Sequence, residues 1–147
     1  MKMVAFTCCA LATAHAVSAA TITVECPKKF PADAIFFKGT PQGWTAFAPS
    51  ELEVTSGELM YGPPSSYTYA VPATYRAGKR LEVGTWGASS TGQNWLQCGY
   101  GAAKELTLSQ QLPPGLAECT IKKYKDPRGN VEQVSASCTV APPLRKK

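Results

Sequence analysis

The sequence predicts an all-β protein: a small antiparallel sandwich or barrel, held by two disulfides and containing at most one short helix. One observation behind this is that apolar and polar residues alternate over several short runs, which is the period of a strand with one buried face. Another is that twelve prolines and twelve glycines are spread over 147 residues and would interrupt long helices. A hydrophobic content of 44% with 17% charged residues indicates a globular chain rather than a disordered one.

The first twenty residues have the organisation of a secretory signal peptide. Lys2 gives a basic start, residues 4–14 are apolar but too short to span a bilayer, and Val17-Ser18-Ala19-Ala20 supplies small residues for a signal peptidase. We therefore expect export, to the bacterial periplasm or the medium. No later stretch is apolar over 18 residues, so no membrane span is expected in the mature chain.

The rest of the chain predicts a single β-rich domain over residues 21–140, followed by a flexible basic tail over residues 141–147. Loss of Lys2 with the signal peptide lowers the net charge from +5 to +4. Three of the remaining positive charges come from Arg145, Lys146 and Lys147. Because the body of the domain is nearly neutral, nucleic acid is not an expected partner.

Four cysteines remain after cleavage, and an exported chain with four cysteines is expected to form two disulfides. They are Cys26, Cys98, Cys119 and Cys138, and each occupies an apolar position in a run where apolar and polar residues alternate. The sequence Asp126-Pro127-Arg128-Gly129 has the chemistry of a type I turn, which would place Cys119 opposite Cys138. This favours Cys119–Cys138 with Cys26–Cys98, while Cys98–Cys119 with Cys26–Cys138 stays open. The mature chain contains no C-x-x-C pair, so neither a metal site nor a redox pair is expected.

Other strands are expected where short apolar runs are separated by turn residues. They cover residues 22–26, 35–37, 52–54, 59–61, 67–71, 79–86, 96–100, 104–108, 118–125 and 131–140. Thr40-Pro41-Gln42-Gly43 and Ser56-Gly57 are among the predicted turns. A one-turn helix is possible near residues 30–34 or 106–111.

The composition excludes several kinds of enzyme. The single histidine, His15, leaves with the signal peptide, which removes serine and cysteine triads that depend on histidine. Glu51 and Glu53 alternate with apolar residues, as on a solvated strand face. We therefore expect no enzyme, no catalytic residue, no metal and no cofactor. A small cell-wall hydrolase using such carboxylates is kept as an alternative.

Aromatic residues are the remaining functional signal. Tyr61, Tyr67, Tyr69 and Tyr75 lie in a segment rich in proline and serine, and exposed tyrosines there would suit a protein partner. An equally good interpretation is that they pack over the end of the sandwich. Trp44, Trp86 and Trp95 could stack on sugars, although burial is favoured in so short a chain. Lys122, Lys123 and Lys125 are expected on a soluble edge strand.

Several short motifs resemble a family of small exported proteobacterial proteins of uncharacterised function, some encoded near type VI secretion genes. The similarity runs over nearly the whole mature chain and is strongest in one run, Trp95-Leu96-Gln97-Cys98-Gly99-Tyr100. Weaker matches are Cys26-Pro27, Gly43-Trp44-Thr45, Gly62-Pro63-Pro64, Trp86, Leu112-Pro113, Cys119 and Cys138. The resemblance implies a periplasmic setting and an immunity role, in which the protein binds and blocks a toxin.

These observations lead to a non-enzymatic periplasmic binding protein, an immunity or inhibitor protein against an effector that targets the cell wall. Its expected partner is a protein, either a toxin or a cell-wall enzyme. A module that binds carbohydrate or peptidoglycan through exposed aromatic residues is the alternative outside the inhibitor class.

Overall fold

The computed structural model describes residues 20–48, 50–89 and 92–141, and it is an all-β sandwich, as predicted. The predicted signal peptide and basic tail lie outside the described residues, apart from Ala20 and Ala141. The strands are β1 (Thr21–Glu25), β2 (Lys29–Phe30), β3 (Leu52–Tyr61), β4 (Thr74–Ala77), β5 (Leu81–Gly87), β6 (Asn94–Tyr100), β7 (Leu106–Gln111), β8 (Leu116–Lys125) and β9 (Val131–Val140). The described residues contain two short 3₁₀ turns, η1 (Ala32–Ala34) and η2 (Pro64–Ser66), and no helix that could cross a membrane.

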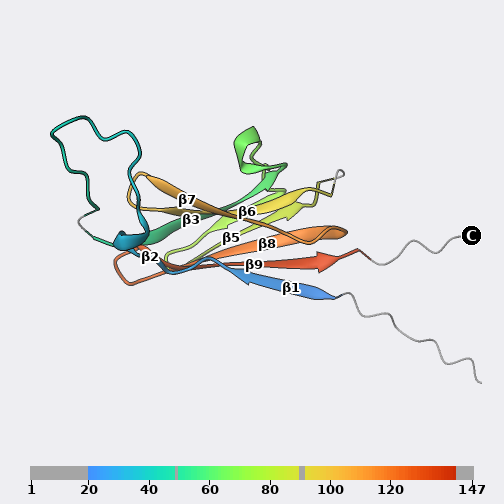
Figure 1. Ribbon diagram of the computed structural model, residues 1–147. Coiled ribbons are helices and arrows are strands. Elements are labelled where there is room, and N and C mark those ends of the chain that lie inside the picture. The colour runs from blue at the N-terminus through green and yellow to red at the C-terminus, as the bar shows by residue number, and fades with distance from the viewer. Residues whose placement is uncertain (1–19, 49, 90–91, 142–147) are drawn as a thin grey trace, which may run out of the picture.

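Two antiparallel sheets pack face to face (Figure 1). The first has five strands in the order β1-β9-β8-β5-β4, and the second has four in the order β2-β3-β6-β7. Neither sheet closes on itself within the described residues, so of the two predicted architectures the sandwich is the one that forms. Buried side chains from both sheets form the core between them, including Val54, Leu59, Leu96, Tyr100, Ile121 and Val134.

The β8–β9 hairpin has the register predicted from its turn. Cys119 pairs with Cys138 and Ile121 pairs with Ala136. The turn is closed by the amide of Gly129, which donates to the carbonyl of Asp126 at 3.1 Å. The Cys119–Cys138 disulfide therefore joins residues that are direct neighbours across two strands, with their Cα atoms 4.0 Å apart.

The second disulfide, Cys26–Cys98, connects the two sheets. Cys26 follows β1 of the first sheet, whereas Cys98 lies in β6 of the second, and their Cα atoms are 5.8 Å apart. Both cysteines are buried in the core. The structure thus confirms the favoured pairing and rules out the alternative that the sequence left open.

Three local predictions were wrong. Residues 52–54 and 59–61 belong to one continuous strand, β3, because Ser56-Gly57 is no turn but a buried part of it. A Cβ on Gly57 would lie 2.3 Å from Val134 Cγ1, so glycine is required there by the close approach of the facing sheet. Residues 35–37 and 67–71 form no regular strand. Of the two positions considered for a one-turn helix, the first forms the 3₁₀ turn η1, while residues 106–111 form strand β7, which overlaps the strand expected at 104–108.

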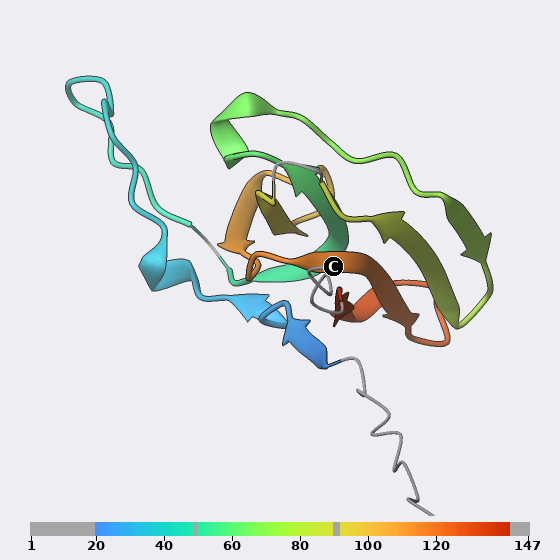
Figure 2. The ribbon, with the colours of Figure 1, turned by 90° about the vertical axis from the view of Figure 1, so that its right-hand side faces the viewer.

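Two long connections leave the sandwich. We call residues 36–47 the aromatic arm; they lie between η1 and β3 and extend well away from the body (Figures 1 and 2). We call residues 61–75 the tyrosine strap; they lead from β3 in the second sheet to β4 in the first. Both project toward the same side of the molecule, the upper side in Figures 1 and 2.

Candidate functional site

The tyrosine strap closes one open side of the sandwich. It first follows the outer edge of β3, where the amide of Tyr61 donates to Thr68 O and the amide of Ala70 donates to Leu59 O, each at 2.9 Å. It then reaches the other sheet, where the amide of Ala73 donates to Thr85 O at 2.8 Å. Because each end pairs with a different sheet, these hydrogen bonds hold the strap, which connects the two sheets along the chain, against both of them.

The strap is also held by the indole of Trp86. This side chain is buried, and its Nε1–H donates to the carbonyl of Ala70 at 3.0 Å. Its ring lies against Gly84, where a Cβ would come within 2.3 Å of the ring. Burial of Trp86 agrees with the interpretation favoured from sequence and removes it from any sugar-stacking surface.

Three of the four candidate tyrosines use their hydroxyl groups inside the molecule. Tyr61 donates to Gly87 O at 2.8 Å, Tyr69 donates to Gln97 Oε1 at 2.9 Å, and Tyr75 donates to Glu82 Oε2 at 2.8 Å. Tyr67 is different, since 76% of it is exposed and it follows η2 in a left-handed conformation with φ of 50°. The structure therefore does not gather all four tyrosines into one surface.

Tyr69 and Tyr75 do share a groove between the strap and the two sheets. Its volume is about 480 Å³. The residues that line it come from β3, the strap, β5 and β8, and they are Gly57, Glu58, Tyr69, Ala70, Pro72, Tyr75, Trp86 and Lys123. Since two aromatic rings face it and both remain about half exposed, the groove offers partly apolar surface to a partner.

One wall of this groove is fixed by the carboxylate of Glu82. Its side chain is 14% exposed and receives hydrogen bonds from Tyr75, from Lys123 Nζ at 2.9 Å and from Lys125 Nζ. Partial burial alone would raise the pKa of Glu82, but the hydrogen bonds from Lys125, Lys123 and Tyr75 outweigh it and lower that pKa to about 2. The hydrogen bond to Glu82 in turn raises the pKa of the Tyr75 hydroxyl, and burial and the carboxylate charge add to this effect.

The role of the lysines on β8 corrects the sequence prediction. Strand β8 lies inside the first sheet, between β9 and β5, rather than at its edge. Lys123 and Lys125 are half-buried partners of Glu82, and Lys123 Nζ lies 5.9 Å from the ring centroid of Tyr75. These lysines therefore stabilise the groove wall, whereas an edge strand would present them to solvent.

The three tryptophans lie in three separate elements. Trp86 is on β5 in the first sheet, Trp95 is half-buried on β6 in the second sheet, and Trp44 is 76% exposed on the aromatic arm. Of the three tryptophans that the sequence left as candidates for stacking on sugars, only Trp44 presents a freely exposed indole.

The aromatic arm contains exposed residues that sequence reasoning missed. Phe36 and Phe47 are 85% and 75% exposed, and Phe37 is also exposed. The apolar run at 35–37 predicted a buried strand, whereas the chain leaves the sandwich at this point. The sequence did contain a signal for an exposed loop here. Among the four aromatic residues lie two glycines and a proline, Gly39, Pro41 and Gly43, and this composition suits an exposed loop.

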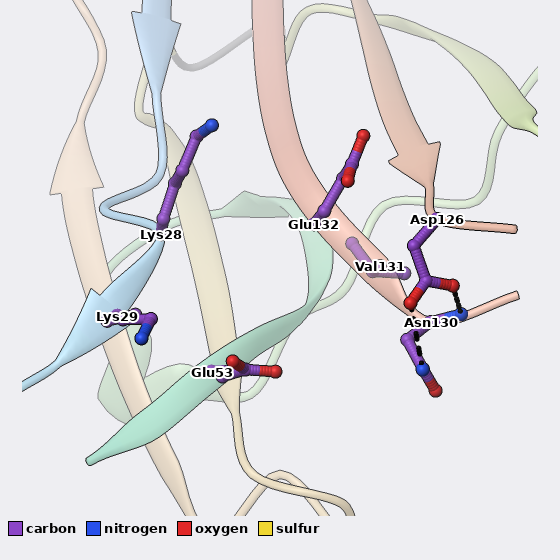
Figure 3. Close-up of a pocket in the computed structure, with 7 residues that line it drawn as sticks. All are labelled: Lys28, Lys29, Glu53, Asp126, Asn130, Val131 and Glu132. Carbon is purple, nitrogen blue, oxygen red and sulfur yellow. Dashed lines mark hydrogen bonds between the residues drawn. The ribbon is translucent and has the colours of Figure 1, made fainter. Parts of the chain in front are cut away.

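A charged hollow of about 260 Å³ lies at the base of the arm (Figure 3). It is lined by Lys28 just before β2, by residues of β2 and β3, by the β8–β9 turn and by the start of β9: Lys28, Lys29, Glu53, Asp126, Asn130, Val131 and Glu132. Asp126 accepts hydrogen bonds from Asn130 N at 2.8 Å and from Asn130 Nδ2 at 3.1 Å. Desolvation would raise the pKa of Asp126, but the hydrogen bonds from Asn130 and the turn amides lower it, so this group is a turn carboxylate rather than a general acid.

Only one of the two glutamates considered from the sequence lines this hollow. Glu53 lines it, while Glu51 is paired with Lys29, which raises the pKa of that lysine. Across the described ranges, no cluster of three histidine, cysteine or acidic side chains is arranged to hold a metal ion.

Comparison with known proteins gives one family match. Residues 49–139 match the family described as Type VI secretion system Tli immunity protein. The matched segment begins two residues after the arm, ends at Thr139 in β9 and covers more than half of the chain. Neither the curated proteins nor the solved structures contain a significant match. The resemblance inferred from the sequence pointed to the same secretion system, and the chain belongs to the Type VI secretion system Tli immunity protein family.

Proposed function

We propose that this protein is a periplasmic immunity protein that binds and blocks a type VI effector directed at the cell wall. The observation that carries this proposal is the family match over residues 49–139. Members of an immunity family protect by occupying a toxin, which requires a rigid surface of defined shape rather than reactive groups. Under this proposal, the chain acts as a binding protein and not as an enzyme.

The two disulfides support the periplasmic location. Disulfides form and persist in oxidising compartments such as the bacterial periplasm and are rare in the cytosol. Both are buried in the core, and one of them joins the two sheets. The signal peptide proposed for residues 1–20 would deliver the chain there, leaving residues 21–140 as the working domain and residues 141–147 as a basic tail.

The tyrosine strap supplies one proposed contact surface. Tyr67 is exposed at its turn, and Tyr69 and Tyr75 face the groove. Tyr61 contributes mainly by positioning the strap, since its hydroxyl donates a hydrogen bond to the carbonyl of Gly87. Rigid aromatic side chains lose little conformational entropy on binding, so they are suitable anchors for a protein partner.

The direct test uses a candidate effector, sought first among the products of the genes that neighbour the one for this chain. We expect the purified effector to bind the purified mature chain at a ratio of one to one in calorimetry, and to lose its activity on sacculi in the complex. Tyr67→Ala is expected to weaken binding about tenfold, because an exposed anchor is lost without disturbing the fold.

Two results would contradict the proposal. An effector that binds but remains fully active would exclude inhibition as the function. An effector that releases lipid from phospholipid vesicles but leaves sacculi intact would keep the immunity role and exclude the cell wall as the target.

A second candidate function, binding of cell-wall sugars, is favoured by one observation. Trp44 presents an exposed indole, and flat aromatic rings can stack on sugar rings. Titration with muropeptides would then quench the Trp44 fluorescence in the wild-type chain but not in Trp44→Phe. An unchanged spectrum in the wild-type chain would eliminate this candidate.

A further inference from the structure

We propose that the aromatic arm, residues 36–47, is the principal anchor on the effector, and that it inserts into the apolar cleft where the effector binds its substrate. This inference rests on the proposed immunity function and adds to it the contacting surface and the kind of site it enters.

Exposure of the arm is the first argument. Phe36, Phe37, Trp44 and Phe47 are all exposed, whereas most other large apolar residues of the domain contribute to the core. Aromatic side chains bury large areas when a partner covers them, and they are enriched among the residues that dominate binding. Four such side chains within twelve residues therefore indicate a surface that is covered in the working complex.

The shape of the arm is the second argument. It extends away from both sheets in two perpendicular views, so it presents a projection rather than a flat face (Figures 1 and 2). In the middle of the arm, the amide of Trp44 donates to Pro41 O at 3.1 Å, and Gly43 supplies the positive φ of +83° that this turn needs. A projecting aromatic loop that contains such a turn is suited to a concave site, and apolar concave sites in enzymes are their ligand pockets.

The low charge of the arm favours a protein partner over a membrane. Lys38 is the single charged residue between positions 36 and 48. At the base of the arm, Lys29 is already paired with Glu51. Loops and helices that bind anionic membranes combine exposed aromatic residues with clusters of lysine and arginine, which the arm lacks.

The test compares single variants in calorimetry with the purified effector. Trp44→Ala is expected to weaken binding at least thirtyfold, the range of a hot-spot residue, whereas Tyr67→Ala weakens it about tenfold. These two side chains are equally exposed in the free chain, at 76% each, so they form a matched pair. Thr23→Ala, on the exposed side of β1 far from the arm, is the control and should bind as the wild type does.

Fluorescence provides a readout that does not depend on affinity. Binding should shift the emission of Trp44 to shorter wavelength, and the shift should be absent in Trp44→Phe if Trp86 and Trp95 keep their environments. Phe36→Ala combined with Phe47→Ala should weaken binding without changing the thermal midpoint, because both side chains are exposed in the free chain.

The outcomes separate this inference from the proposed function. If the wild-type chain binds the effector and Trp44→Ala binds equally well, the inference is wrong and the immunity role stands. Loss of vesicle binding in Trp44→Ala with unchanged effector binding would assign the arm to a membrane. Dissociation of a wild-type dimer by the same change would assign it to a second copy of the chain. A wild-type chain that binds no effector would overturn the proposed function itself.

Discussion

Glu82 is the carboxylate whose charge matters most for the stability of the groove wall. Its pKa of about 2 lies below its ordinary value of 4.5, because three hydrogen-bond donors favour the ionised form. A group with a lowered pKa in the folded state stabilises the fold above its unfolded pKa. This contribution is therefore complete above a pH of about 4.5 and disappears as the pH falls from 4.5 toward 2.

Replacing Glu82 with glutamine tests this linkage. At pH 7, Glu82→Gln is expected to lower the free energy of unfolding by on the order of 2 kcal/mol, since it leaves Lys123 and Lys125 without their partner. The difference from the wild type should shrink as the pH falls below 4.5. Urea denaturation at several pH values measures it, with the exposed Glu118→Gln as control. A difference that stays constant down to a pH of about 2 would show that the carboxylate acts through its shape and not its charge.

Gly57 shows why some single positions could not be interpreted from the sequence. Next to Ser56 it has the composition of a turn, and only the approach of Val134 from the other sheet reveals its role. The exposure of Trp44 is hidden for a similar reason, because tryptophan is usually buried and its exposure depends on where the chain leaves the sandwich. The role of Gly57 and the exposure of Trp44 both depend on how segments far apart in the sequence are arranged in space, which local sequence patterns do not reveal.

The β8–β9 hairpin, in contrast, is predictable in detail. Its turn residues and its period-2 pattern are local signals, so the sequence alone is sufficient to favour the pairing of Cys119 with Cys138. The sequence of strand β7 also allowed a helix, because a run of six residues with few turn signals suits either structure. The tyrosine strap is partly predictable, since its tyrosines stand out in the sequence but their internal hydrogen bonds do not.

The two disulfides are expected to contribute unequally. In the chain-entropy model, closing the 72-residue loop of Cys26–Cys98 is worth roughly 4 kcal/mol, and closing the 19-residue loop of Cys119–Cys138 roughly 3 kcal/mol. The first also joins the two sheets, while the second joins strands that the hairpin already aligns. Replacing Cys26 and Cys98 with alanine should therefore destabilise the protein more than replacing Cys119 and Cys138.

Guanidinium denaturation of the two double variants measures this difference. The wild type after full reduction serves as the reference and should be less stable than either variant. A greater loss from the Cys119 and Cys138 variant would mean that strain or denatured-state structure, rather than loop length, controls the contribution.

The proposed periplasmic location of the whole chain makes a prediction about protection. A version that begins at Thr21 after an initiator methionine stays in the cytosol, where disulfides do not persist. We expect it to give no protection against an effector delivered to the periplasm, measured as survival of recipient cells in competition. Fusion to an unrelated signal peptide should restore protection. Full protection from the cytosol would contradict the proposed site of action.

The order of the cysteines along the chain has a consequence for how the protein matures. Among the four cysteines after residue 20, the first and second form one bridge, and the third and fourth form the other. A thiol oxidant that acts on sulfurs as they emerge from the translocation pore would join each one to the next and obtain the native arrangement directly. Maturation on this route has no requirement for a disulfide isomerase.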